Sequence, residues 1–200
     1  MKIKDTISSP REILFGVPQG SILGPILFVV YVNDLSSYLP NCYIVQYADD
    51  TQILLEGEID NLEDLVKRAE EVLKNVKLYF QMHGLLLNEN KTQCIFIGSR
   101  QYISEIGENV CINFNGNIIE PSKEVKNLGV YFDRYMSFDS HIDNVYRKVM
   151  GTLIYLNRVK DCFEPTTTSI IVQSLAMRIV NYCCTVWGST SLVHLGRVQK

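Results

Sequence analysis

The apolar residues of the chain recur at a helical spacing in its longer segments. Asp60-Asn61-Leu62-Glu63 has the spacing of a capping box, and apolar residues then return every three or four positions as far as His83-Gly84. Glycine is common just beyond a helix end, so this segment is predicted to be one long helix. A second helix is predicted from Ser137 onward and a third from Pro165, because proline suits the first helical turn.

Shorter apolar runs lie between these helices and have the features of strands. Two pairs of runs flank turn-forming residues, Ala48-Asp49-Asp50 in one case and Asn115-Gly116-Asn117 in the other, which predicts two hairpins. Antiparallel strand pairs with helices between them indicate an α+β fold. The predicted strands are Tyr43–Tyr47, Thr51–Leu55, Cys94–Ile97, Val110–Phe114, Ile118–Glu120 and Val125–Phe132.

The composition excludes two broad classes of protein. Of the 200 residues, 46% are hydrophobic and 10% are aromatic, which is enough to bury a core, so the chain is not disordered throughout. The longest apolar run, Ile22–Val32, is interrupted by Gly24-Pro25 and is too short to cross a bilayer. It also lies too far from the N-terminus to act as a signal peptide. We therefore expect an intracellular protein that has no membrane partner.

The cysteines and histidines do not form a metal motif. None of the six cysteines belongs to a C-x-x-C pair, and the three histidines are scattered along the chain. Without a secretory signal, reduced thiols are the simplest expectation, and a structural zinc site is not predicted.

Charge is distributed unevenly along the chain. The whole chain has a net charge of −3, which does not by itself indicate a nucleic-acid-binding protein. Residues 134–200 contain 8 basic and 4 acidic residues, a net charge of +4, whereas residues 1–133 contain 11 basic and 18 acidic residues, a net charge of −7. This asymmetry suggests different partners for the two segments, although random variation on solvated surfaces would also produce it.

Two adjacent acids, Asp49 and Asp50, lie in the turn of the first predicted hairpin. A turn can bring neighbouring carboxylates around one point, where they repel each other unless a cation lies between them. Oxygen ligands of this kind suit Mg²⁺ or Mn²⁺. The alternative is that both are ordinary turn residues, a common role of aspartate. The apolar strands on either side favour a site.

Upstream of this hairpin, the segment Gly16–Pro25 contains three glycines and two prolines and is followed by an apolar helix. Glycine allows a ligand to approach the backbone closely, and the start of a helix presents unpaired N–H groups to anions. Gln19 adds a side-chain donor and acceptor. A rigid turn between a loop and a helix would account for the same pattern.

The loop and the acidic pair together resemble reverse transcriptases, and specifically those of non-LTR (LINE-like) retrotransposons. In that family, G-V-P-Q-G-S-x-L-G-P-x-L-F precedes a Y/F-A-D-D hairpin, as Pro18-Gln19-Gly20-Ser21 here precedes Tyr47-Ala48-Asp49-Asp50 by 29 residues. The resemblance extends in the same order to Gly84–Thr92, to Asn127-Leu128-Gly129-Val130 and to Tyr182 with Trp187-Gly188.

The resemblance implies an RNA-directed DNA polymerase that uses an RNA template, a DNA primer, dNTPs and Mg²⁺ or Mn²⁺. For the parent element, it makes the nucleus a plausible location within the cell. It implies a partial palm over residues 1–133, an antiparallel sheet packed on helices, followed by a truncated thumb-like helical segment over residues 134–200. Two ions about 4 Å apart would activate the primer hydroxyl and stabilise the leaving oxygen.

The implied residue roles follow from the motifs. Asp49 and Asp50 would hold metal, with Asp49 the stronger ligand, and Lys91 would approach the leaving pyrophosphate unless it is a solvated loop lysine. The implied binding residues are Pro18, Gln19 and Gly20 for nucleotide and template, and Tyr47, Leu128 and Gly129 for the primer.

The sequence departs from the family pattern at its N-terminus. Family members carry another metal-binding Asp on a strand before the Pro-Gln-Gly loop, whereas only residues 1–15 precede that loop here. Asp5, in Lys4-Asp5-Thr6-Ile7, does not match that motif, and the chain ends at Lys200 where the family continues. We therefore interpret the chain as an internal piece of a longer reading frame and expect that it does not polymerise by itself. Two alternatives stay open, a non-catalytic nucleic-acid-binding remnant and a group II intron-type reverse transcriptase.

Overall fold

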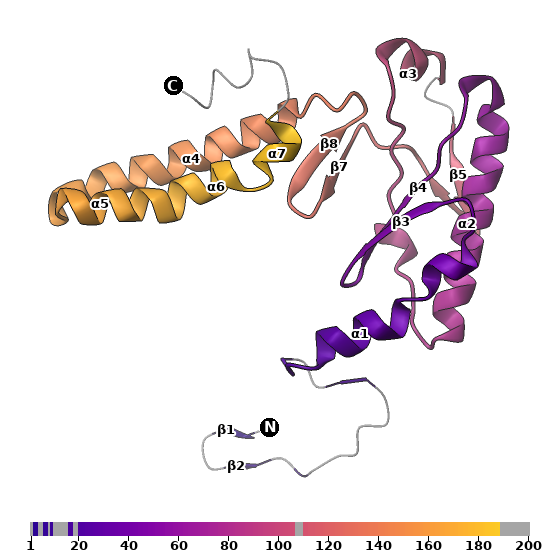
Figure 1. The fold of residues 1–200 in the computed structure, drawn as a ribbon, viewed down its shortest axis with the longest axis horizontal. Coiled ribbons are helices and arrows are strands. Elements are labelled where there is room, and N and C mark those ends of the chain that lie inside the picture. The colour runs from indigo at the N-terminus through magenta and orange to yellow at the C-terminus, as the bar shows by residue number, and fades with distance from the viewer. Residues whose placement is uncertain are drawn as a thin grey trace. The chain divides into compact units, whose positions relative to one another are not determined.

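A computed structural model describes residues 2–3, 6–7, 9, 16–17, 20–106 and 110–188 (Figure 1). The chain divides into two compact units, and each is described by itself. The first unit comprises Met1–Gly57 and Glu71–Leu87, and the second comprises Glu58–Glu70 and Asn88–Lys200. The long helix α2 (Leu62–Met82) thus contributes its first turns to the second unit and its later turns to the first.

The described part of the first unit contains helix α1 (Gly24–Val32), a short 3₁₀ turn, two antiparallel strand pairs and the later turns of α2. Helix α1 begins at Gly24 because Pro25 has the backbone angle of a first helical turn and the Gly24 N–H donates to the Ser21 hydroxyl over 2.9 Å. The elements of this unit are β1 (Lys2–Ile3), β2 (Thr6–Ile7), α1 (Gly24–Val32), η1 (Leu35–Tyr38), β3 (Tyr43–Tyr47), β4 (Asp50–Leu54) and the later turns of α2.

The core of the first unit lies between η1 and α2. Buried apolar side chains from these elements meet in one cluster, against which Ile44 and Ile53 of the hairpin pack. The Tyr79 hydroxyl donates to Asp34 over 2.5 Å, and the Tyr31 hydroxyl donates to the His83 carbonyl over 2.7 Å. The buried members of the cluster are Val32, Leu35, Leu39, Val76, Tyr79 and Phe80.

The second unit joins two hairpins to a pair of antiparallel helices, in which α4 lies beside the chain from α5 to α6 (Figure 1). Its small core consists of Val130, Phe138, Ile142 and Trp187. The elements are η2 (Ile59–Asn61), η3 (Glu89–Lys91), α3 (Arg100–Ile106), β5 (Ile112–Phe114), β6 (Asn117–Ile119), β7 (Glu124–Asn127), β8 (Val130–Asp133), α4 (Asp139–Val159), η4 (Lys160–Cys162), α5 (Pro165–Val172), the π-helical segment η5 (Gln173–Met177), α6 (Arg178–Asn181) and α7 (Cys184–Trp187).

The predicted α+β class and the two long helices, α2 and α4, are confirmed. The third predicted helix begins at Pro165 as α5, but it continues through the π-helical segment η5 into the short α6. The prediction of one strand over Val125–Phe132 is wrong. This segment is the β7–β8 hairpin, which turns at Leu128-Gly129 with φ angles of 45° and 89°. Leucine is uncommon in this left-handed conformation, so the turn has no clear sequence signal.

Two smaller predictions also need correction, and one element was not predicted. The β5–β6 turn has two residues, Asn115-Gly116, and Asn117 already pairs with Phe114. The predicted strand Cys94–Ile97 is not formed, since only Cys94 makes an isolated bridge, to Pro121. Helix α3 had no counterpart among the predictions. Within the described residues, no helix is long and apolar enough to span a membrane.

Candidate functional site

The β3–β4 hairpin places the acidic pair at its tip. The strands are in register from Tyr43 opposite Leu54 to Tyr47 opposite Asp50, so the turn is Ala48-Asp49. Ala48 adopts a positive φ of 51°, which closes the turn in two residues. The predicted hairpin is therefore confirmed, with Asp50 in the first position of β4 and only Asp49 in the turn itself.

The two faces of this hairpin differ in burial. Ile44 and Ile53 pack against the core of the first unit. The opposite face is open, and Tyr47 is 63% exposed there. Since paired residues of an antiparallel ladder share a face, Asp50 lies on the same open face as Tyr47. One face thus anchors the hairpin while the other presents Tyr47 and Asp50.

The carboxylates of Asp49 and Asp50 are both exposed. Among the residues that the structure describes, neither carboxylate has a hydrogen bond or an ion pair, and no group of three or more His, Cys, Asp or Glu side chains is placed to hold a metal. Two adjacent, solvated carboxylates fit a hard divalent cation that keeps several of its waters, which is how Mg²⁺ usually binds to proteins. The donor set therefore fits Mg²⁺ or Mn²⁺.

The glycine-rich loop is described in part, since Pro18 and Gln19 lie outside the described residues. Gly20 is exposed and has a positive φ of 83°, a conformation that side-chain-bearing residues rarely adopt. Gly24 is buried, and a Cβ there would lie 2.9 Å from the Ser21 hydroxyl and 3.2 Å from Val17. The loop thus requires glycine at both positions for its shape.

Lys91 belongs to the second unit, in the 3₁₀ turn η3, and is exposed. Its N–H donates to the Asn88 carbonyl over 3.1 Å, which closes this turn. The turn is connected to the β5–β6 hairpin because the Asn117 amide donates to Glu89 over 2.8 Å. These hydrogen bonds hold the backbone that carries Lys91, and the residue itself is exposed.

Leu128 and Gly129 form the turn of the β7–β8 hairpin. The Tyr182 hydroxyl donates to the Leu128 carbonyl over 2.6 Å, and a Cβ on Gly129 would lie 3.5 Å from the Tyr182 ring. The sequence indicated Tyr182 only through its family resemblance. Its contact with the turn joins residues 54 positions apart, which no local pattern reveals.

Asp133 is a structural residue that the sequence interpretation missed. Its carboxylate accepts hydrogen bonds from the N–H groups of Tyr135, Ser137 and Phe138 and from the Ser137 hydroxyl. Burial alone would raise the pKa of Asp133, but these four donors outweigh burial and hold its pKa below the ordinary value of 3.8. The carboxylate thereby fixes the chain between β8 and α4.

The described site residues are divided between the two units. Tyr47, Asp49 and Asp50 lie together at one hairpin tip in the first unit, which also contains Gly20. Lys91 and the Leu128-Gly129 turn belong to the second unit. The structure thus brings together the acidic pair with Tyr47, and separately Leu128 with Gly129.

Residues 2–132 match the family model described as reverse transcriptase (RNA-dependent DNA polymerase). Because the match covers more than half of the chain, this protein belongs to the reverse transcriptase family. The chain is 25% identical, over 96% of its length, to the RNA-directed DNA polymerase from mobile element jockey of Drosophila melanogaster. It is 32% identical, over 72% of its length, to the retrovirus-related Pol polyprotein from type-1 retrotransposable element R1 of Nasonia vitripennis.

These relatives confirm the non-LTR group that the motifs predicted. The chain spans only 21% of the jockey protein and 43% of the R1 protein from Nasonia. No solved structure gives a significant match to the chain.

Proposed function

We propose that this chain is the part of an RNA-directed DNA polymerase that carries the acidic hairpin of the active site. The observation that carries the proposal is the hairpin tip, where Asp49 and Asp50 are exposed together while Ile44 and Ile53 anchor the hairpin in the core. Residues 1–133 would form part of a palm, and residues 134–200 a thumb-like segment.

In this proposal, Asp49 and Asp50 hold Mg²⁺ or Mn²⁺, with Asp49 the stronger ligand. A bound divalent cation would lower the pKa of the primer hydroxyl and stabilise negative charge on phosphate. Tyr47 shares a face with Asp50 and would contact the primer terminus. Lys91, which is exposed, would bind the departing pyrophosphate. The other binding residues would be Pro18, Gln19 and Gly20 for nucleotide and template, and Leu128 and Gly129 for the primer strand.

The template and primer would form an RNA–DNA duplex bound mainly by the basic segment. Residues 134–200 carry a net charge of +4, and exposed Arg147, Lys148 and Arg158 lie on α4. Phosphate contacts by such residues release counterions, so affinity is expected to fall as the salt concentration rises. Salt-independent binding would contradict this assignment.

A binding measurement tests the proposal without requiring turnover. The full chain is titrated, by fluorescence anisotropy in Mg²⁺ and in EDTA, into two RNA–DNA hybrids of equal length. One hybrid has a recessed primer 3′ end and the other is blunt. A polymerase site predicts tighter binding of the recessed hybrid in Mg²⁺, by about tenfold, equivalent to about 1.4 kcal/mol.

Asp49→Asn is expected to remove this preference, whereas Asp64→Asn, a control at an exposed position in the first turn of α2, is expected to keep it. Equal affinity for the two hybrids in the unsubstituted chain would contradict a polymerase site. That result would favour the alternative, a remnant that binds nucleic acid without catalytic function.

A further inference from the structure

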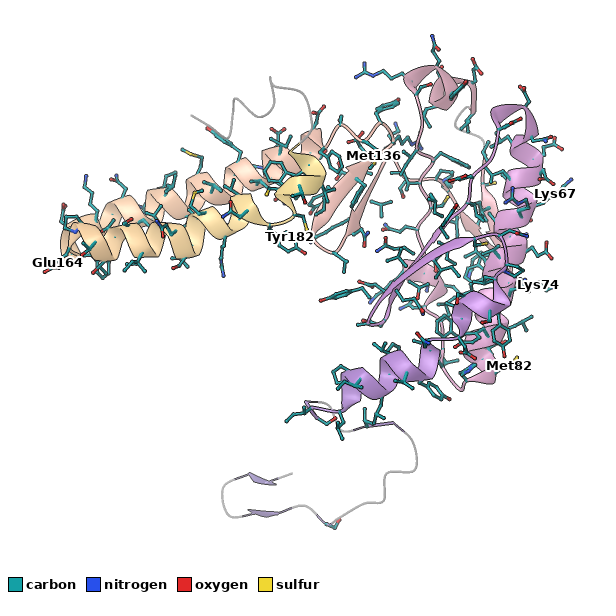
Figure 2. The ribbon with its side chains drawn as sticks, in the orientation of Figure 1. Lys67, Lys74, Met82, Met136, Glu164 and Tyr182 are labelled. Carbon is teal, nitrogen blue, oxygen red and sulfur yellow. The ribbon has the colours of Figure 1, made fainter. Side chains whose placement is uncertain are left out.

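Tyr182 connects the helical segment to the turn that the proposed function assigns to the primer. It follows the last residue of α6, and Figure 2 shows it where the helical pair meets the β7–β8 hairpin. Its hydroxyl donates to the Leu128 carbonyl over 2.6 Å, and its ring lies on the side of Gly129 where a Cβ would point, 3.5 Å from that position. One side chain therefore binds the first residue of the turn and lies beside the second.

The backbone of Tyr182 is itself anchored in the core of the second unit. The Trp187 indole N–H donates to the Tyr182 carbonyl over 2.9 Å. Trp187 is 2% exposed and packs with Val130 and Phe138. A continuous series of contacts thus runs from the core, through Trp187 and Tyr182, to the Leu128 carbonyl.

The turn needs this support because of its own geometry. Leu128 and Gly129 both have positive φ angles, a conformation that is unfavourable for leucine. The paired positions of the hairpin end at Asn127 opposite Val130, so the Leu128 carbonyl lies beyond the ladder and takes its hydrogen bond from Tyr182. Removing the Tyr182 hydroxyl would leave this carbonyl to solvent and release the tip of the turn.

We propose that Tyr182 is a positioning residue for the primer strand: it fixes the Leu128-Gly129 turn relative to α6 and α7. This inference rests on the proposed function, because it requires that the turn contact the primer. A duplex bound by the basic segment, residues 134–200, would then have its primer end held by a turn that Tyr182 connects to the same segment. Tyr182 itself need not touch the nucleic acid.

The test uses Tyr182→Phe in the full chain, which removes the hydroxyl and keeps the ring. Affinity for the recessed and blunt RNA–DNA hybrids is measured by anisotropy in Mg²⁺, together with thermal unfolding. Loss of one hydrogen bond that fixes the turn is expected to weaken binding of the recessed hybrid about fivefold and to leave the blunt hybrid unchanged. Tyr102→Phe is the matched control, since Tyr102 is exposed on α3 of the same unit.

Each outcome bears on the inference. A selective loss for the recessed hybrid in Tyr182→Phe, with Tyr102→Phe unchanged, supports it. An equal loss for both hybrids, with a lower unfolding temperature, means that Tyr182 is merely structural and overturns it. Unchanged affinities in Tyr182→Phe overturn it as well, while the proposed function survives. If the unsubstituted chain shows no preference for the recessed hybrid, the proposed function fails and the inference fails with it.

Discussion

Asp133 gives the sharpest stability prediction, because four hydrogen bonds converge on its carboxylate. The N–H groups of Tyr135 and Phe138 donate over 2.8 and 2.7 Å, and Ser137 donates through both its N–H and its hydroxyl. Asp133→Asn keeps the size of the side chain, but it removes the charge and turns an NH₂ group toward one set of donors. The Phe138 N–H belongs to a buried residue, so it cannot simply turn to water.

The size of the effect follows from these partners. A hydrogen bond to a charged acceptor contributes about 1.5–3 kcal/mol, and leaving a buried donor unpaired costs about 1–3 kcal/mol. Asparagine still accepts at one oxygen and Asp133 is half-buried, so the expected loss at pH 7 is about 2 kcal/mol. Urea unfolding followed by circular dichroism measures this loss. Asp161→Asn, at an exposed position in η4, is the control and should change the free energy of unfolding by less than about 0.5 kcal/mol.

The difference in stability between the unsubstituted chain and Asp133→Asn should depend on pH. The pKa of Asp133 in the folded chain lies below its ordinary value of 3.8, so the unfolded chain binds this proton more tightly. The stabilisation is complete above pH 3.8 and is lost as the pH falls through the folded pKa. The difference between the unsubstituted chain and Asp133→Asn should therefore stay constant from pH 7 to pH 5 and shrink below pH 4. A loss below about 0.5 kcal/mol at pH 7, or a difference that persists undiminished at pH 3, would show that these hydrogen bonds do not stabilise the fold in this way.

Three further predictions concern other parts of the chain. Gly129→Ala should destabilise the fold by about 1–2 kcal/mol because φ is 89° there, whereas Gly151→Ala, in open space within α4, should stabilise it by about 0.5–1 kcal/mol. Equal unfolding temperatures of the two variants would contradict this. Burial and, to a smaller extent, Lys148 lower the pKa of His141 below 6.5, so the free energy of unfolding should fall as the pH drops from 7 to 5. A fall of equal size in His141→Gln would show that another group is responsible. In primer extension on an RNA template, the 200-residue chain should incorporate no nucleotide, because two adjacent carboxylates at a hairpin tip do not fix a two-metal centre to within about half an ångström. Incorporation that Asp49→Ala abolishes would disprove this.

The long helices could be predicted because a period of 3.6 residues persists over many turns. Helix α2 occupies the segment that the Asp60–Glu63 and His83-Gly84 signals delimit, and α5 begins at Pro165 as expected. The β3–β4 hairpin could be predicted for a similar reason, since its apolar strands flank polar turn residues. In each case local chemistry and tertiary packing favour the same structure.

The contacts that fix the second unit could not be predicted from the chain. The Leu128-Gly129 turn places leucine at a positive φ, which overrides its local preference, and Tyr182 stabilises it from 54 residues away. Three of the four hydrogen bonds to Asp133 come from backbone N–H groups, which every residue except proline carries, and only the fourth, from the Ser137 hydroxyl, depends on a particular side chain. Motifs therefore identified the residues of the candidate site, while their supports became visible only in the structure.

Metal binding at the β3–β4 tip is the most direct test of the central claim that Asp49 and Asp50 form the acidic centre of a reverse transcriptase. Titration of the full chain with Mn²⁺, followed by paramagnetic broadening of backbone amide signals, locates the ion without requiring activity. If the two carboxylates bind the ion, broadening is selective for Ala48–Thr51, Mg²⁺ reverses it, Asp49→Asn abolishes it and Asp64→Asn leaves it unchanged. Broadening that is centred elsewhere in the chain, or that persists in Asp49→Asn and Asp50→Asn alike, would contradict it.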